Sequence, residues 1–264
     1  MKIPLSVFII AKNEEKRIFK TIDAVKNFAD EIIVVEDGST DNTVETAEKA
    51  GAKVVHNKWK GYGPQKKFGE NLCKNKWVLS IDADEEVTSE LADEIIELFT
   101  KKNSDKHCEF SGYKIKITNT LWYEKRPNRF AGYINRIRLY DKSKAGFKNS
   151  TVHDCVIIKD VAENSREEQK RTKQLKNIII HRPIISIEQK ISKINFYSTL
   201  QAENAILKRK KSSTLKITFG FTAIFFKYYI LKRYFIYGID GIALSMIDAF
   251  AQFLKYYKIK ELNR

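Results

Sequence analysis

The sequence predicts an α/β protein with a mainly parallel β-sheet flanked by helices, a smaller mixed sheet and a helical C-terminal region. Three observations indicate this class. Over the first hundred residues, short apolar runs alternate with segments of helical periodicity. Apart from Ser6, the run over 5–11 is continuously apolar, which is typical of a strand buried on both faces. The 264 residues suffice for one large domain, or for one domain and an appendage.

Apolar spacing and turn residues divide the first half of the chain into elements. We expect strands over 5–11, 31–35, 53–55 and 77–81. We expect helices over 14–28, 42–50, 64–73 and 89–100. Gly51 is placed to end the second helix, and Ser89 to cap the fourth. Glu85 and Glu86 are expected at the start of that fourth helix, where its dipole favours negative charge.

The pattern changes after Gly112, where apolar and polar residues alternate. The stretches "GYKIKIT", "RIRLYDK" and "TVHDCVII" predict strands of the smaller mixed sheet. A charged linker over 162–173 and a short strand over 175–180 should follow, and the chain reads as helical from Ile187. We therefore predict a main domain over 1–186, with halves 1–105 and 106–186, and a basic, aromatic-rich helical tail over 187–264.

The charge of the chain calls for an anionic partner. The net charge is +15, and residues 205–264 hold 12 Lys and Arg against 3 Asp and Glu, a net of +9. Lysines interrupt the apolar runs of the tail, so we expect no run of the ~20 residues that span a bilayer. The interleaved aromatic and basic residues favour helices lying in a membrane interface. The alternative is a set of basic helices packed on the domain, with solvated lysines.

The cysteines and the N-terminus indicate the compartment. Three cysteines, with no spacing typical of a metal site, are expected to be reduced thiols of a cytosolic protein. The first residues show no small-residue cleavage site, and their apolar run fits a buried strand better than a signal peptide.

Acidic and amide side chains follow three of the predicted strands. In open α/β sheets, ligands bind outside the carboxyl ends of the strands, so these side chains should meet at one edge. Crowded carboxylates repel one another unless a cation joins them, and hard oxygen ligands favour Mg²⁺ or Mn²⁺ shared with substrate phosphates. The residues are Asn13, Glu14, Glu36, Asp37, Asp82, Asp84 and Glu85.

Other interpretations of "IDADEE" are weaker. A Walker B strand would need a GxxxxGK[ST] loop, which the chain lacks. An EF-hand needs Gly at its sixth position, where Val87 stands. A phosphatase-type DxD motif usually has Thr or Val where Glu86 stands. A solvated helix start remains the structural alternative.

Four motifs in order resemble the nucleotide-sugar-binding half of family 2 glycosyltransferases. They are "LSVFIIAKNEEKRI", "EIIVVEDGSTDNTVETAEKAGAKVV", "KGYGPQKKFGEN" and "WVLSIDADEEVTSEL", and they cover about the first 95 residues. The later stretches "RIRLYDK", "TVHDCV", "IIIH" and "YSTLQAE" resemble the subgroup that adds the first sugar to the lipopolysaccharide inner core.

This resemblance implies a GT-A fold that binds a nucleoside-diphosphate sugar in residues 1–105 and an acceptor in 106–186. It places Asp82 at the ribose or metal shell, Asp84 on the metal and Lys66 near the phosphates. Lys67 replaces an asparagine that is common in the family, and Glu36 replaces a more usual aspartate. The residues implied to hold the nucleobase and ribose are Asn13, Glu14, Glu36 and Asp37.

The resemblance also implies inversion at the anomeric carbon, which requires a base for the acceptor hydroxyl. Asp154 stands at the family's acidic position, with Asp141 and Asp160 as alternatives. His181 is similar to a late histidine that completes metal coordination, although a lone histidine at a strand end is often simply packed. His153 is placed to orient the base or the diphosphate.

Three arginines are candidates for the acceptor phosphate. Arg136 and Arg138 should alternate onto one strand face, with Arg129 near by. They could grip the phosphate bidentately, and a solvated basic face is an equal alternative. His56 and His107 are expected to be structural.

The sequence thus predicts an inverting, metal-dependent hexosyltransferase, bound peripherally to the inner face of the cytoplasmic membrane. Its donor is expected to be UDP-glucose, and its acceptor a phosphorylated glycolipid such as a lipopolysaccharide inner-core sugar. One alternative is a nucleic-acid-binding α/β protein, which leaves the strand-end acids unexplained, so we expect no nucleic acid partner. Another is a nucleotidyltransferase, which would normally show a glycine-rich loop after the first strand.

Overall fold

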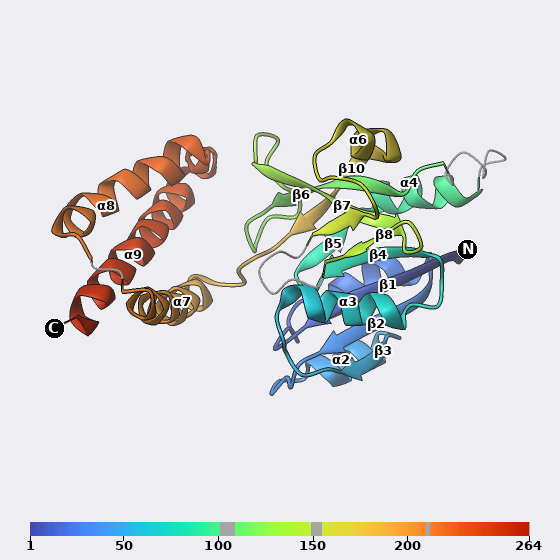
Figure 1. Ribbon diagram of the computed structural model, residues 1–264, viewed down its shortest axis with the longest axis horizontal. Helices are drawn as coiled ribbons and strands as arrows, with labels where there is room; N and C mark the ends of the chain where they lie inside the picture. The colour runs from blue at the N-terminus through green and yellow to red at the C-terminus, as the bar shows by residue number, and fades with distance from the viewer. Residues whose placement is uncertain (101–108, 149–154, 210–211, 264) are drawn as a thin grey trace. The chain divides into compact units, whose positions relative to one another are not determined.

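The computed structural model describes residues 1–100, 109–148, 155–209 and 212–263. Contacts divide the chain into two compact units. Unit 1 comprises Met1–Thr118 and Tyr133–His181, and unit 2 comprises Asn119–Gly132 and Arg182–Arg264. Figure 1 shows the elements of both. The predicted assignment of 1–105, 106–186 and 187–264 to donor, acceptor and tail remains a prediction.

Unit 1 is built on an eight-stranded sheet, which confirms the predicted α/β class. The order is β3-β2-β1-β4-β7-β6-β10-β5, with β3, β2, β1 and β4 parallel and β7 antiparallel to β4. The strands are β1 (Ile3–Ala11), β2 (Ala29–Glu36), β3 (Lys53–His56), β4 (Trp77–Asp82), β5 (Glu85–Val87), β6 (Gly112–Asn119), β7 (Tyr133–Asp141) and β10 (Thr172–His181).

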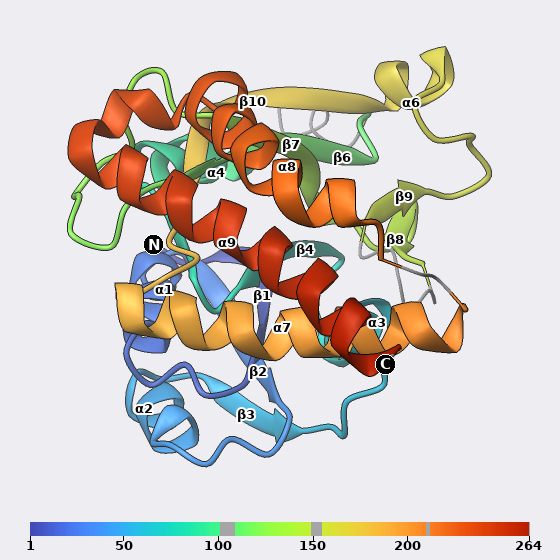
Figure 2. The ribbon, with the colours of Figure 1, turned by 90° about the vertical axis from the view of Figure 1, so that its left-hand side faces the viewer.

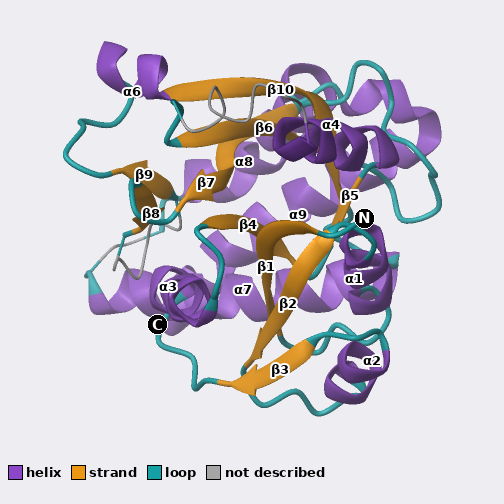
Figure 3. Ribbon diagram, turned by 90° about the vertical axis from the view of Figure 1, so that its right-hand side faces the viewer, coloured by secondary structure: helices purple, strands orange, loops and turns teal. Residues whose placement is uncertain are grey.

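Helices cover both faces of the parallel strands (Figure 3). Residues of β1 alternate between the two apolar cores, so that Val7 and Ile9 face one core and Phe8 faces the other. This explains why the run over 5–11 is apolar at successive positions. One core takes side chains from α1 (Ile18–Lys26), α2 (Thr43–Lys49) and α4 (Ser89–Thr100), and the other from α3 (Tyr62–Leu72).

Three local predictions in unit 1 are corrected. The strands "GYKIKIT" and "RIRLYDK" extend the main sheet as β6 and β7, and the small sheet pairs β8 (Ala145–Phe147) with β9 (Val156–Ile158). The expected linker contains α6 (Arg166–Arg171), because Ser165 caps it by accepting from Glu168 N at 3.1 Å. Glu85 and Glu86 lie in β5, and Thr88 Oγ1 rather than Ser89 accepts from Leu91 N, at 3.2 Å.

Unit 2 is helical from Ile187, as the sequence indicates (Figure 2). Its elements are α7 (Ile187–Leu207), α8 (Thr214–Phe226), the π-helical turn η1 (Lys227–Leu231), the 3₁₀ turn η2 (Tyr234–Tyr237) and α9 (Gly238–Leu262). Residues 119–132 are tied to this unit through Arg182, whose Nη1 donates to Glu124 O at 2.6 Å, and through Tyr123, which donates to Asp240.

One segment contradicts the expectation that no part of the tail could span a bilayer. By length and composition, Tyr234–Leu262 is long and apolar enough to cross a membrane. The basic residues that interrupt the apolar runs precede this segment, and from Gly238 to Leu254 α9 has only two charged residues. Of its acids, Asp240 accepts from Tyr123, and Asp248 pairs with Lys190 at 2.7 Å.

Candidate active site

The carboxyl ends of β1, β2 and β4 lie level with one another. Ala11 pairs with Glu36, and Ile10 pairs with Asp82. The polar residues that follow these strands therefore gather at one edge of the sheet, because parallel strands in register end together.

Asp82 lies in a buried cluster of four charges. Its Oδ1 is 2.9 Å from Lys66 Nζ, its Oδ2 is 3.2 Å from Arg138 Nη2, and its backbone N donates to Glu85 Oε2 at 3.0 Å. Arg138 Nη2 is also 2.5 Å from Glu85 Oε1. Lys66, Glu85 and Arg138 are buried. Two cations thus balance two carboxylates, which makes this burial possible.

The two acids of the cluster differ in pKa. Burial opposes the ionisation of Asp82, but the charges of Lys66 and Arg138 outweigh it and hold the pKa of Asp82 well below its usual range. Burial raises the pKa of Glu85 to about 7, against the opposing charge of Arg138 and with the added repulsion of Asp82. Asp82 is therefore the firmly ionised member.

A β-bulge aims Arg138 at this cluster. Tyr113 pairs with Leu139, whereas Lys114 pairs with Ile137, so Arg138 is the extra residue of β7. The prediction that Arg136 and Arg138 share one face is therefore wrong, because one extra residue changes the alternation. Arg138 is buried against acids and Arg136 is exposed. Arg129 belongs to unit 2.

Glu14 and Asn13 serve the loops around the sheet edge. Arg17 binds the Glu14 carboxylate through Nε and Nη2, each at 2.6 Å, and its Nη1 lies 3.8 Å from Asp84 Oδ2. Asn13 has a left-handed backbone (φ 55°), and its Oδ1 accepts from Thr40 N at 2.8 Å. Asn tolerates this conformation, so Asn13 can join the end of β1 to the loop after β2.

Glu36 and Asp37 hold the loops after β2 and β3. Glu36 Oε2 accepts from Ser39 N at 2.9 Å, and its Oε1 lies 2.5 Å from His56 Nδ1. Asp37 Oδ1 accepts from Trp59 N at 2.9 Å. Burial opposes the charge on Glu36, but these hydrogen bonds prevail and lower the pKa of Glu36. His56, expected to be structural, thus partners a predicted nucleoside-binding acid.

Asp84 and His181, the two predicted metal ligands, meet at the same edge. His181 Nε2 lies 3.3 Å from Asp84 Oδ2, although 97 residues separate them. The pairing of β5 with β10 sets His181 opposite Glu85. Thr21 Oγ1 donates to Ala83 O at 2.9 Å and so fixes the turn between β4 and β5, which contains Asp84. Burial opposes the charge on His181, but the Asp84 hydrogen bond and the nearby acids outweigh it and raise the pKa of His181.

The donor set of this pair suits a divalent cation that takes its other ligands from a diphosphate. Mg²⁺ commonly binds through one or two carboxylates together with substrate phosphates, and imidazole is a ligand of transition metals. Within the described residues, no group of three or more His, Cys, Asp or Glu side chains could hold a metal ion. Asp82 is already occupied by Lys66 and Arg138. Asp84 and His181 therefore fit as a partial site.

The predicted base, Asp154, lies outside the described residues, as do His153 and His107. Its two alternatives lie at the end of β7 and in the turn after β9. Asp141 is buried, accepts from Ser143 N at 2.9 Å, and pairs with Trp77, at the opposite end of β4 from Asp82. Asp160 is exposed in a turn with φ 61°. Within the described part of the chain, neither alternative forms a hydrogen bond or an ion pair with the charge cluster.

Of three residues that support this edge, the sequence analysis missed Arg17 and gave Glu85 and Arg138 other roles, at a helix start and at the acceptor phosphate. Arg17, Glu85 and Arg138 each neutralise or anchor a predicted site residue. The three-residue spacing of Glu14 and Arg17 is a usable signal, because side chains at i and i+3 are neighbours on a helix. Glu85 and Arg138 gave no such signal, since 53 residues separate them.

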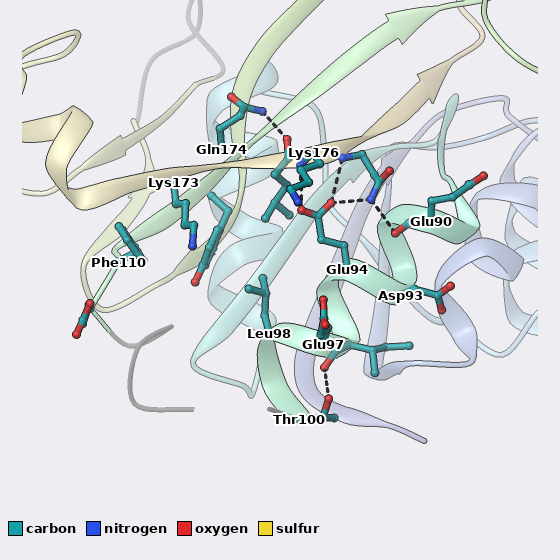
Figure 4. A pocket seen from close by; sticks show the side chains of 15 residues that line it. Glu90, Asp93, Glu94, Glu97, Leu98, Thr100, Phe110, Lys173, Gln174 and Lys176 are labelled. Atoms are coloured by element: carbon teal, nitrogen blue, oxygen red, sulfur yellow. Dashed lines mark hydrogen bonds between the residues drawn. The ribbon is translucent and has the colours of Figure 1, made fainter. Parts of the chain in front are cut away.

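A separate cavity of about 1030 Å³ lies beside α4 and β10 (Figure 4). Its acidic wall is partly structural. Glu94 Oε1 accepts from Lys176 N at 2.9 Å, and its Oε2 accepts from Asn177 N at 3.0 Å, which fastens α4 to β10. None of the predicted site residues lines this cavity.

Comparisons with known proteins give a consistent result. The family model described as "Glycosyl transferase family 2" matches residues 6–164. An uncharacterized glycosyltransferase of Rickettsia bellii is 45% identical over 263 residues, covering 98% of this chain and 87% of the relative. A lipopolysaccharide core biosynthesis glycosyltransferase of Rhizobium meliloti is 29% identical over 265 residues, covering 98% and 92%.

A solved structure, glucosyl-3-phosphoglycerate synthase from Mycobacterium tuberculosis with Mn²⁺ and UDP, is 24% identical. The match covers 44% of this chain and 43% of that one, with a TM-score of 0.34. A similarity of this extent carries no argument about the present chain.

Proposed function

The chain belongs to glycosyl transferase family 2, and from this premise we propose that it transfers glucose from UDP-glucose to a phosphorylated glycolipid. The acceptor class is a lipopolysaccharide inner-core sugar. Support comes from the motifs shared with the inner-core subgroup and from the name of the Rhizobium relative. The main observation that supports the proposal is that Asp84 and His181 lie in contact. They lie beside the charge-balanced cluster, where β1 and β4 end at the same level of the sheet.

The donor diphosphate is proposed to lie against Asp84, His181 and Lys66. Asp84 and His181 would hold Mg²⁺ or Mn²⁺, which when bound supplies Lewis-acid stabilisation of the charge on the departing diphosphate. Lys66 is held by Asp82, so its ammonium is fixed in place before the donor arrives. A preorganised cation stabilises developing negative charge without the cost of reorganisation.

The nucleoside is proposed to bind Glu36 and Asp37, with Asn13 and Glu14 shaping the pocket floor. A carboxylate has about four acceptor positions, so Glu36 and Asp37 can accept further hydrogen bonds from a base or ribose. Their present contacts, to Ser39 N and Trp59 N, fix the carboxylates toward the loops. Asp82 is proposed to act indirectly, by positioning Lys66 and Arg138.

Transfer is proposed to proceed with inversion. The acceptor oxygen attacks the anomeric carbon, its proton passes to a carboxylate, and the bond to the diphosphate breaks with its electron pair leaving on the diphosphate oxygen. Asp154 is proposed as that carboxylate. The atoms and charges of this step balance with the donor, the acceptor and the carboxylate alone.

Unit 2 is proposed to hold the protein on the inner face of the cytoplasmic membrane, where a lipid-borne sugar is accessible. The support is its composition, with basic residues beside exposed apolar side chains such as Phe219 and Leu231. We propose that 1–105 binds the donor, 106–186 the acceptor, and 187–264 the membrane.

The proposal is tested by calorimetric titration with UDP, GDP, ADP and CDP, with and without Mn²⁺. We expect UDP to bind in a Mn²⁺-dependent manner, and Asp84→Ala to weaken that binding at least about tenfold, because a metal ligand is lost. Asp93→Ala, which removes an exposed acid of α4, is the matched control and should bind as wild type. Binding of none of the four nucleotides, or equal binding by Asp84→Ala, would contradict the proposal.

A further inference from the structure

Unit 2 contains a cavity of about 540 Å³ that the donor chemistry does not use. It lies between α7, the junction of α8 and η1, and α9. Its lining combines apolar side chains, such as Ile194 and Ile224, with polar groups that are basic in excess. The polar groups that matter here are Lys190, Lys193, Lys227, Tyr197, Tyr228 and Asp248.

The charges of the lining do not cancel. Lys190 Nζ lies 2.7 Å from Asp248 Oδ1, and the two side chains are only 14% and 15% exposed, so this pair is neutral as a unit. Lys193 donates to Pro183 O at 3.3 Å. Asp248 is the only acid among the lining residues, and the lining therefore has a net charge of +2.

The chemistry of the lining selects the kind of anion. Ammonium groups bind phosphate as point charges, and the hydroxyls of Tyr197 and Tyr228 add hydrogen-bond donors. A phosphate monoester has a charge of about −1.5 to −2 at neutral pH, which matches a lining of +2 better than a diester does. The cavity is thus suited to a phosphomonoester.

The residues next to Lys227 in the chain indicate what the phosphate is attached to. Lys227 is exposed and stands between Phe226, which is 51% exposed, and the η1 residues Ile230 and Leu231, which are 53% and 77% exposed. Large exposed apolar side chains beside a basic site favour a ligand with an apolar body. A soluble anion would leave these side chains in water.

We propose that this cavity binds the phosphomonoester headgroup of a membrane lipid, with Lys193 and Lys227 as the selective cations. The inference rests on the proposed function, because it names the group by which unit 2 recognises a membrane-borne, phosphorylated lipid. It assigns to the tail a defined recognition site in addition to diffuse attraction by its positive charge.

The test measures binding of the full chain to phosphatidylcholine vesicles that contain either phosphatidic acid, a monoester, or phosphatidylglycerol, a diester. The two sets are matched in surface charge by measured zeta potential. We expect tighter binding to the phosphatidic acid vesicles. Lys193→Gln/Lys227→Gln should reduce that binding about tenfold or more and remove the preference, since each lysine near an anionic surface contributes about 1 kcal/mol.

The matched control is Lys208→Gln/Lys260→Gln, which removes the same charge from exposed positions outside the cavity. It should weaken binding to both vesicle types alike and keep the preference. Equal binding of wild type to the two vesicle types, or equal loss of preference in both double variants, would overturn the proposal. Circular dichroism verifies that each variant keeps its helices.

Two further measurements separate the possible failures. Inorganic phosphate should compete only weakly with phosphatidic acid vesicles, and equal affinity for free phosphate would overturn the assignment to a lipid. UDP titration with Mn²⁺ should be unchanged in Lys193→Gln/Lys227→Gln. A chain that prefers phosphatidic acid but binds no nucleotide would support the cavity and contradict the proposed function, whereas nucleotide binding without lipid preference would do the reverse.

Discussion

The two units differ in how they place their apolar side chains. In unit 1, strand residues such as Val7, Phe8 and Leu79 are fully buried, and the acids at the sheet edge have cationic partners from the same unit. In unit 2, Leu215 and Ile239 are 68% and 75% exposed. Among the described residues, 18 of 24 exposed large apolar side chains belong to unit 2, the shorter unit. Unit 1 is satisfied internally, and unit 2 presents a surface that requires a partner.

The largest expected effect would break the internal balance of unit 1. Arg138→Ala leaves the buried Glu85 and the partly buried Asp82 with one cation fewer, and removing one partner of a buried ion pair costs about 3–5 kcal/mol. Urea unfolding should report a loss of that size in the free energy of unfolding. Arg136→Ala, at an exposed position of the same strand, should change it by less than about 0.5 kcal/mol. Equal effects of the two changes would refute the buried cluster.

The next effect concerns chemistry in unit 1. Asp154→Asn should reduce kcat about 100-fold or more, because the amide cannot accept the proton of the acceptor hydroxyl. Mn²⁺-dependent UDP binding should persist, as the donor contacts remain. Asp160→Asn is the matched control, since Asn tolerates its left-handed backbone, and it should keep full activity. Full activity of Asp154→Asn would move the role of the base elsewhere.

A smaller effect would sharpen the contrast in apolar exposure. Leu231→Ser with Ile239→Ser removes two exposed apolar side chains of unit 2, and should weaken binding to anionic vesicles about tenfold by loss of buried apolar area. Phe19→Ser removes a side chain of unit 1 that is 50% exposed, and should leave vesicle binding unchanged. Co-sedimentation measures both. If Phe19→Ser weakens binding as much, the contrast between the units does not hold.

The smallest effect concerns Glu70, a buried acid of α3 in unit 1. Glu70 Oε2 accepts from Tyr140 Oη at 2.8 Å and from Phe147 N at 3.0 Å, which fastens α3 to β7 and β8. Tyr140→Phe removes one of these hydrogen bonds and should cost about 1 kcal/mol in urea unfolding. Tyr133→Phe, on the exposed part of β7, should be neutral. A neutral Tyr140→Phe would show that Glu70 is satisfied without the hydroxyl.

The sequence alone determined the α/β class, the order of the first strands and helices, and the residues that follow the strand ends. It could do so because apolar periodicity records which faces an element buries, and because parallel strands bring their carboxyl ends to one edge. The convergence of Asn13, Glu36 and Asp82 follows from these local patterns. The pairing of Asp84 with His181 was anticipated by resemblance to the family.

Only the tertiary structure decided where the charges are balanced. Arg138 is the extra residue of a bulge, and strand alternation contains no record of an inserted residue. The sequence predicts Glu85 at a helix start, where the dipole favours negative charge, yet it lies in β5 against an arginine 53 residues away. The environment of a carboxylate such as Glu85 depends on which strands lie next to it in the sheet. That choice is made by long-range packing, whereas the periodicity of a single segment decides only which of its faces is buried.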